Sequence, residues 1–206
     1  MKYYDVTMPV SPEMLAYTGD PVFYSENVID LDKGDKCTVS KMSMGSHMGT
    51  HIDAPAHFIK GGATVDQLQA DKLCGKVKVF HIPNKAEIEV SDIESLDICK
   101  DDIVFFKTRN SELLKKDTFD PEYTYLTPEA ARFLVEKGIK TVGIDYLSID
   151  KFGEHGAHIA LLSEGIVITE GLMLSDVPSG EYQMAAVPMK IKGGNGAPIG
   201  IILSCG

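Results

Sequence analysis

The chain is dominated by short stretches in which apolar residues recur at strand spacing. Apolar and polar side chains alternate in residues 37–44 and 76–82, which predicts strands with one buried face. Residues 102–108 instead have a continuous apolar centre, which is typical of a strand covered on both faces. In all, we expect strands at residues 3–10, 37–44, 76–82, 102–108, 141–144, 166–170, 182–191 and 197–204.

Helix signals are fewer, and the clearest covers residues 128–137. Thr127 can cap the first turn, Pro128 suits the first helical position, and Gly138 follows the last turn. Weaker patterns predict helical segments at residues 63–75, 91–96 and 153–163. Helices mixed with strands in this way predict a single α/β domain, residues 1–206, with a mixed β-sheet flanked by helices.

Glycine and proline residues mark the connections between these elements. Residues 11–23 contain several of them and are expected to form a long loop, whereas residues 109–126 are polar and irregular. Tyr17 lies in the first loop, where it either lines a pocket or covers the edge of the core. An Asn-Gly pair at 195–196 predicts a tight hairpin turn between the last two strands.

Composition and charge narrow the classes of function. Apolar residues make up 44% of the 206 residues and charged residues 24%, as in ordinary globular proteins. A formal net charge of −10 argues against nucleic acid or a membrane surface as a partner, because both select for basic surfaces. We expect no secretory signal and no membrane span. The scattered cysteines predict reduced, buried thiols in a cytoplasmic protein, at Cys37, Cys74, Cys99 and Cys205.

The chemistry is concentrated in residues 46–58, where half of the six histidines lie. A helix is disfavoured there, because Gly49 weakens it and Pro55 breaks it. In an extended chain His51, Asp53 and His57 would project on one side. A fold-back at Gly49 would bring His47 to the same place. Imidazole and carboxylate are the usual ligands of zinc and related ions, so this stretch predicts one half of a metal site. The candidate groups are His47, His51, Asp53 and His57.

A second group of polar residues is expected to supply the other half. His155 and His158 are three residues apart on a predicted helix, and Glu170 ends a buried strand. The simpler interpretation of His155 is an exposed residue at the start of the helix. His81 lies in a strand away from both groups, and we expect it to be structural.

These segments resemble the cyclase-like metal-dependent hydrolases, the family of bacterial kynurenine formamidase and isatin hydrolase. The main signature is His47-x-Gly-Thr-His51-x-Asp53-x-Pro-x-His57-Phe58. Further resemblance lies in Tyr17-Thr-Gly-Asp-Pro, Asp145-Tyr-Leu-Ser-Ile-Asp150, His158-Ile-Ala-Leu-Leu, Ile168-Thr-Glu170-Gly-Leu and the segment from Tyr182 onward. The resemblance covers nearly the whole chain and implies the swivelling β/α/β fold of that family.

The resemblance also implies a role for each candidate residue. His47, His51 and Asp53 would bind one divalent metal ion, and Asp53 would bridge to a second ion. The second ion would be held by His158, with Glu170 touching both ions. His57 would be the catalytic acid and base rather than a ligand, and Tyr17 would face the substrate. The family further suggests a homodimer or a higher homo-oligomer.

The expected reaction is hydrolysis of a small amide by metal-activated water. The resemblance points to an N-formyl aryl amine such as N-formylkynurenine, an intermediate of tryptophan catabolism, or to a related lactam. Zinc is the expected metal and manganese the second choice, with one or two ions per subunit. The alternatives are hydrolysis of another cyclic amide or ester, of the isatin kind, and a metal-dependent binding protein without catalysis. A purely structural site fits less well, because such sites favour four closed ligands and often cysteine.

Overall fold

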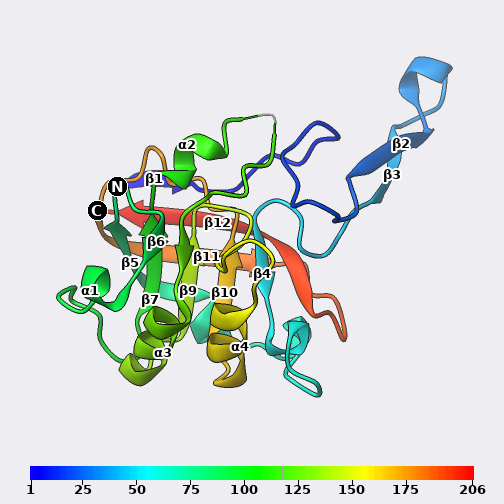
Figure 1. Cartoon of the computed structure of the whole chain (residues 1–206). Helices are drawn as coiled ribbons and strands as arrows, with labels where there is room; N and C mark the ends of the chain where they lie inside the picture. Colours follow the sequence, from blue (N-terminus) through cyan, green and yellow to red (C-terminus); the bar gives the residue numbers. More distant parts are fainter. Residues whose placement is uncertain (117) are drawn as a thin grey trace.

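The computed structural model describes residues 1–116 and 118–206, and its centre is one eight-stranded mixed sheet (Figure 1). The strands run in the order β1-β12-β11-β5-β7-β9-β10-β4, and β4 also pairs with β12. The sheet therefore closes on itself at β4. Its strands are β1 Lys2–Asp5, β4 His51–Asp53, β5 Cys74–His81, β7 Ile103–Lys107, β9 Thr141–Ile144, β10 Val167–Glu170, β11 Gly180–Pro188 and β12 Gly196–Cys205. Pairing is parallel from β5 through β7 and β9 to β10, and antiparallel elsewhere.

Apolar side chains pack on both faces of this sheet. Phe105 of β7 belongs to the cluster inside the closed sheet, together with Ile52 of β4. Its neighbours Val104 and Phe106 belong to the cluster under the helices, because successive side chains of a strand point to opposite faces. The helices that cover this outer cluster are α1 Val90–Ile93, α3 Pro128–Lys137 and α4 Gly156–Ser163. The predicted mixed sheet flanked by helices is confirmed.

The predicted helix at residues 128–137 is confirmed, with the expected cap residues. The Thr127 side chain accepts a hydrogen bond from the backbone N–H of Ala130 at 3.2 Å. Gly138 ends the helix in the left-handed conformation, at φ +70°, which favours glycine. The predicted helix at 153–163 begins only at Gly156, because the Asp150 carboxylate accepts from the backbone N–H of Ala157 at 2.6 Å and thereby sets its first turn.

The prediction of a helix over residues 63–75 is wrong. Two short 3₁₀ turns, Val65–Gln67 and Ala70–Lys72, occupy the segment, and β5 already begins at Cys74. Its internal backbone hydrogen bonds are limited to these turns, and other backbone groups of the segment bond to distant residues. Val65 N–H donates to the Gly194 carbonyl at 2.9 Å, and the Leu73 carbonyl accepts from Ala186 N–H at 3.0 Å. Tertiary pairing therefore overrides local helix preference here.

Other boundaries also differ from the sequence-based expectations. The first strand ends at Asp5 rather than at residue 10. Residues 109–126 are not irregular throughout, since they contain α2 Asn110–Leu113 and β8 Tyr125–Leu126, which pairs with β6 Glu87–Ile88. The last two strands are joined by residues 189–195 rather than by a tight Asn-Gly turn.

Strands β2 (Tyr24–Ile29) and β3 (Val39–Ser43) form an arm that projects from the body of the molecule (Figure 1). In the described part of the chain these two strands pair only with each other. Every residue of both strands is exposed. The strand expected at residues 37–44 is β3, whereas β2 was not expected from the sequence. We call residues 22–43 the arm.

The cysteines are more exposed than the sequence predicted. All four cysteines are free, but three are exposed and Cys205 is half-buried, so the expectation of buried thiols is wrong. Within residues 1–116 and 118–206, no helix has the length and the apolar character needed to cross a membrane.

Candidate metal centre

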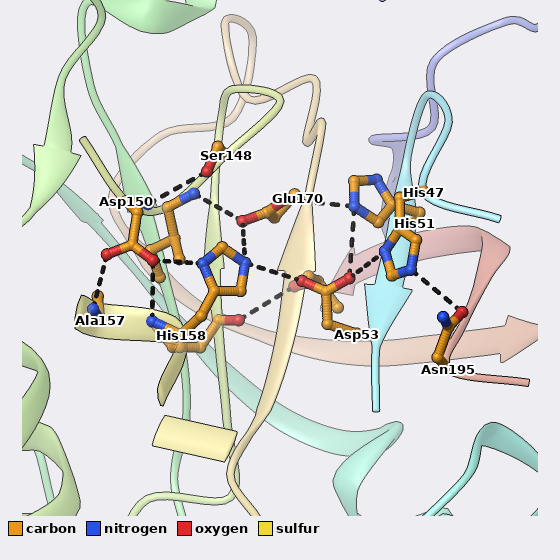
Figure 2. Close-up of polar contacts among 12 residues, drawn as sticks. His47, His51, Asp53, Ser148, Asp150, Ala157, His158, Glu170 and Asn195 are labelled. Atoms are coloured by element: carbon orange, nitrogen blue, oxygen red, sulfur yellow. Dashed lines mark hydrogen bonds and ion pairs between the residues drawn. The ribbon is translucent and has the colours of Figure 1, made fainter. Parts of the chain in front are cut away.

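The residues singled out in the sequence meet where β4, the end of β10 and the start of α4 come together (Figure 2). Strand β4 carries His51 and Asp53 on one face, and Ile52 between them points into the inner core. Glu170, the last residue of β10, is paired with His51 across the two strands. His57 does not continue the extended run, because it lies on the 3₁₀ turn Pro55–His57. The even-spacing expectation is therefore right for the first two residues and wrong for His57.

His51 is held with one ring nitrogen toward the carboxylates. Its Nε2 lies 3.2 Å from Oε2 of Glu170 and 3.5 Å from Oδ1 of Asp53. Its Nδ1 lies 3.0 Å from the Gly49 carbonyl oxygen, which can accept the proton of that nitrogen. A histidine anchored in this way directs its Nε2 at the centre, as metal-binding histidines commonly do.

His158 reaches the same carboxylates from α4. Its Nε2 lies 3.3 Å from Oδ2 of Asp53 and 3.2 Å from Oε1 of Glu170. Its Nδ1 lies 2.5 Å from Oδ2 of Asp150. Asp150 thus orients the ring and caps the helix that carries it. Glu170 is fixed in turn by Ile149 N–H, which donates to its Oε1 at 2.6 Å.

His47 folds back onto the centre through the turn at Gly49, as the sequence predicted. Gly49 has φ +65°, a conformation that favours glycine. The His47 Nδ1 lies 2.6 Å from Oδ1 of Asp53, and its Nε2 lies 3.3 Å from Oδ1 of Asn195. The ring of His57 stacks on that of His47, with 3.9 Å between centroids and 24° between planes.

The donor set fits a divalent cation. Two groups have ligand atoms that all lie within 4.8 Å of one another, His47–Asp53–His57 and His51–Asp53–Glu170. Asp53 belongs to both groups and is fully buried. Burial opposes ionisation of both carboxyls, yet the histidines around them hold the pKa of Asp53 well below its usual value and that of Glu170 below it. Two adjacent buried carboxylates need positive charge nearby, which a metal ion would supply.

Above these groups lies a cavity of about 220 Å³. Its wall includes Tyr17, whose ring packs against Phe119 at 5.0 Å and Phe152 at 5.7 Å between centroids. His155 is exposed at the start of α4, as expected, and it also lines the cavity. His81 is exposed in β5 and is not among the lining residues. The remaining lining residues are Asp20, His47, His51, His57, Phe58, Leu147, Ser148, Glu154, His158 and Glu170.

The pKa of His57 is shifted in the opposite direction from those of His51 and His158. Burial is the largest cause that lowers the pKa of His57, and electrostatic repulsion from the nearby His47 and His158 lowers it further. Asp53 and Glu170 act in the opposite direction, and the pKa comes to about 4. His57 is therefore neutral near pH 7 and has a free lone pair to accept a proton.

Comparison with known proteins agrees with this geometry. The family model described as "Putative cyclase" matches residues 4–151. This chain belongs to that cyclase family. The kynurenine formamidase of Salinibacter ruber is 31% identical over 207 residues, with 98% of this chain and 97% of that enzyme covered. The kynurenine formamidase of Bacillus cereus is 29% identical over 204 residues, with 98% and 97% covered.

Solved structures show the same cyclase-family fold. A structure described as a predicted metal-dependent hydrolase from Bacillus stearothermophilus has a TM-score of 0.87 and 39% identity, covering 98% of this chain and 97% of that one. Isatin hydrolase A from Labrenzia aggregata has a TM-score of 0.85, 24% identity and coverage of 98% and 93%. At that identity the second likeness concerns the fold alone.

Sequence reasoning missed several polar residues of this cyclase-family centre. Asp150 lay in a segment that resembled the family, but nothing in the spacing assigned it to His158. Asn195 was interpreted as a turn residue, whereas its side chain contacts His47. Asp20 lines the cavity, and its pKa is raised chiefly by burial. Asp150 and Asn195 act on side chains distant from any local pattern that could identify them.

The metal-free protein is expected to lose stability as the pH rises above neutrality. Burial opposes the charged form of His51, but Asp53 and Glu170 outweigh it and raise the pKa of His51 to about 9. The stabilisation is complete below the unfolded-state pKa of about 6.5 and is lost as the pH passes through about 9. For His51 alone the loss is on the order of 3 kcal/mol. Urea unfolding of chelator-treated protein between pH 6 and pH 9.5 measures it.

The control for this prediction is the metal-loaded protein. A metal ion binds neutral imidazole and replaces the protons, so its free energy of unfolding should not fall over the same range. A His51→Gln variant of the metal-free protein should also show a smaller fall. An equally stable metal-free protein at pH 6.5 and pH 9 would contradict the assignment.

Proposed function

We propose that this chain hydrolyses the amide of an N-formyl aryl amine, with N-formylkynurenine as the leading substrate. The observation that carries the proposal is the pair of histidine–carboxylate groups that share buried Asp53 at the floor of a cavity. The chain aligns over 98% of its length with enzymes named kynurenine formamidase. The coarser assignment is a metal-dependent hydrolase that acts on a C–N bond outside peptides. The finer one would place it in tryptophan catabolism.

We propose His47, His51 and Asp53 as the ligands of one divalent ion. His158 and Glu170 would hold a second ion, with Asp53 and Glu170 facing both positions. Zinc is the first choice and manganese the second, because imidazole and carboxylate without thiolate accept both. The ion supplies Lewis acidity, which lowers the pKa of water from about 16 toward 7 and polarises the scissile carbonyl.

His57 is proposed to move the proton. Its low pKa leaves the ring neutral, so it can take a proton from the attacking water. The resulting imidazolium is a strong acid, which favours transfer of that proton to the leaving amine. Its ring stacks on His47 at the wall of the cavity, which places it beside the groups that would hold the ion.

Tyr17 is proposed to contact the aromatic part of the substrate. Its ring forms part of the cavity wall and is braced by Phe119 and Phe152, so it offers a fixed flat face. Phe58 lines the same cavity and lies against His57, with 4.4 Å between ring centroids. An aryl amide would be held between apolar rings above the polar floor.

A substrate panel tests the proposed function. The purified protein is assayed with N-formylkynurenine, N-formylaniline, isatin and a simple aryl ester, before and after chelation and after metal is restored. We expect kcat/KM to be highest for N-formylkynurenine, to vanish with the chelator and to return with Zn²⁺ or Mn²⁺. Higher kcat/KM for isatin would replace the formamide by a lactam as substrate. Full activity without metal would overturn the proposal.

We also propose that the chain forms a homodimer through the arm. An isolated two-stranded hairpin is marginal in water, yet the arm exposes several large apolar side chains. Those with more than half of their surface exposed are Val22, Tyr24, Val28, Leu31 and Met42. In the chain, the arm begins two residues after Asp20 and ends four residues before His47, and both of these residues line the cavity. A second copy that covers the base of the arm would therefore lie close to the cavity.

Arm variants test the homodimer. Val28→Glu combined with Met42→Glu should shift the protein from about twice 22.5 kDa to the monomer in size-exclusion chromatography with light scattering. The reason is that charge on both apolar positions opposes burial. Lys36→Glu at the exposed tip is the matched control and should leave the dimer intact. A wild-type monomer would contradict the proposal.

Two further assignments rest on composition and topology. We propose a cytoplasmic location, because the four free cysteines fit a reducing compartment. We also propose that residues 1–206 are one cyclase-like domain, because β4, early in the chain, bonds to both β10 and β12 near its end.

A further inference from the structure

We propose that Asn195 is a positioning residue that fixes the tautomer of His47. This inference rests on the proposed metal site, which needs a lone pair on the His47 nitrogen that faces Asp53. The loop of residues 189–195 provides the partner for the opposite nitrogen (Figure 2). The role of Asn195 would therefore be to decide which ring nitrogen of His47 is available to a metal ion.

The contacts of Asn195 suit an acceptor at its Oδ1 position. The Ser46 hydroxyl donates to this atom at 3.2 Å, and His47 Nε2 lies 3.3 Å from it. An amide oxygen accepts both contacts if Nε2 carries a proton. With its single proton on Nε2, a neutral imidazole has its lone pair on Nδ1. That nitrogen lies 2.6 Å from Oδ1 of Asp53, inside one of the two candidate ligand groups.

The loop that carries Asn195 is held in place by its backbone. The Asn195 carbonyl accepts from Ala54 N–H at 3.0 Å, just beyond the end of β4. The neighbouring Gly193 N–H donates to Oδ1 of Asp66 at 2.9 Å. The side chain of Asn195 is thus presented from a fixed position although the residue itself is exposed.

Gly196 explains why the loop can approach the ring so closely. A Cβ at this position would lie 2.3 Å from Cε1 of His47 and 2.8 Å from both ring nitrogens. The imidazole therefore rests against the bare backbone of residue 196, with His57 stacked on it at 3.9 Å. Asn195 and Gly196 together form the seat of His47.

The other two histidines of the centre show the same arrangement. In both rings Nδ1 points away from Asp53 and Glu170. It faces the Gly49 carbonyl oxygen at 3.0 Å in His51 and Oδ2 of Asp150 at 2.5 Å in His158. Asn195 completes the set for His47. It is an uncharged side-chain acceptor for the histidine, which makes it accessible to substitution without loss of a buried charge.

Zinc affinity tests the proposal without reference to activity. Metal-free protein competes with a chromogenic chelator for Zn²⁺, in wild type and in the variants Asn195→Ala and Asn195→Asp. We expect Asn195→Ala to weaken zinc binding 10- to 100-fold, the usual range for such outer partners. Asn195→Asp keeps an acceptor and should restore affinity to near the wild-type value. Lys192→Ala, in the same loop, is the control and should change nothing.

The outcomes separate this inference from the proposed function. Wild-type protein that binds no zinc would overturn the metal site and the function with it. Wild-type protein that binds zinc, together with an unchanged Asn195→Ala variant, would overturn the role of Asn195 alone. An Asn195→Asp variant as weak as Asn195→Ala would show that the amide donates rather than accepts, which also overturns it. Histidine ring NMR of the zinc-loaded protein gives a direct check, since we expect the His47 proton on Nε2.

Discussion

Replacement of Asp53 by asparagine is expected to weaken metal binding by more than about 100-fold and, with it, to abolish hydrolysis. One Asp53 oxygen faces His47 and His51, and the other faces His158. The amide NH₂ of asparagine cannot serve as a ligand at the position it takes, so at least one of the two proposed ion positions loses its bridge. The loss of affinity should exceed the roughly 100-fold that outer partners reach. Metal content by mass spectrometry and kcat/KM with N-formylkynurenine measure the two effects.

The control for Asp53 is Asp71→Asn, which alters an exposed aspartate outside the cavity that pairs with Lys140 at 3.0 Å. It should keep both metal content and rate. Circular dichroism of both variants shows whether the fold is intact. An Asp53→Asn protein with wild-type metal stoichiometry and activity would remove this residue from the centre.

The His57→Ala variant is expected to keep its metal and to lose about 10²- to 10⁴-fold in kcat, the usual range for a lost general acid and base. The structure makes this a sharp test, because His57 also belongs to a group whose ligand atoms lie within 4.8 Å of one another. Loss of rate with full metal content supports proton transfer. Loss of metal together with rate would make His57 a ligand instead.

His155→Ala is the matched control for His57. This histidine lines the same cavity but is exposed, and it lies against Phe58 at 5.1 Å between ring centroids. We expect it to change KM more than kcat, because it lies at the wall rather than among the candidate ligands. Equal losses in kcat for both variants would mean that His57 has no special role.

The sequence could predict those parts of the centre that depend on local chain geometry. His51 and Asp53 are two residues apart on a strand, so their common face follows from the strand period. His47 follows from the turn that Gly49 permits. His158 and Glu170 lie more than 100 residues away in the chain from Asp53, and family resemblance rather than spacing assigned them. Pairing of β4 with β10 and packing of α4 bring them together, which no local pattern specifies.

The same distinction explains the errors in the fold. The helix at residues 128–137 has its own caps, and it was predicted with its boundaries. The segment 63–75 has a helix-like start at Thr64, but two of its backbone groups bond to Gly194 in the 189–195 connection and to Ala186 of β11. Likewise, the Asn-Gly pair at 195–196 has the composition of a tight turn. The Asn195 side chain contacts His47, and its backbone carbonyl accepts from Ala54 N–H beyond β4. Long-range contacts therefore outweigh turn preference there.

The closure of the sheet at β4 has a consequence for the order of folding. This strand has only three residues, and its partners at Ile168–Glu170 and Gly196–Pro198 lie far along the chain. Contacts of such high sequence separation form late, because the intervening chain must first lose its freedom. During synthesis, His51 and Asp53 leave the ribosome long before the strand that locks them. The centre should therefore bind its metal only after β4 has paired with β10 and β12 and the sheet has closed.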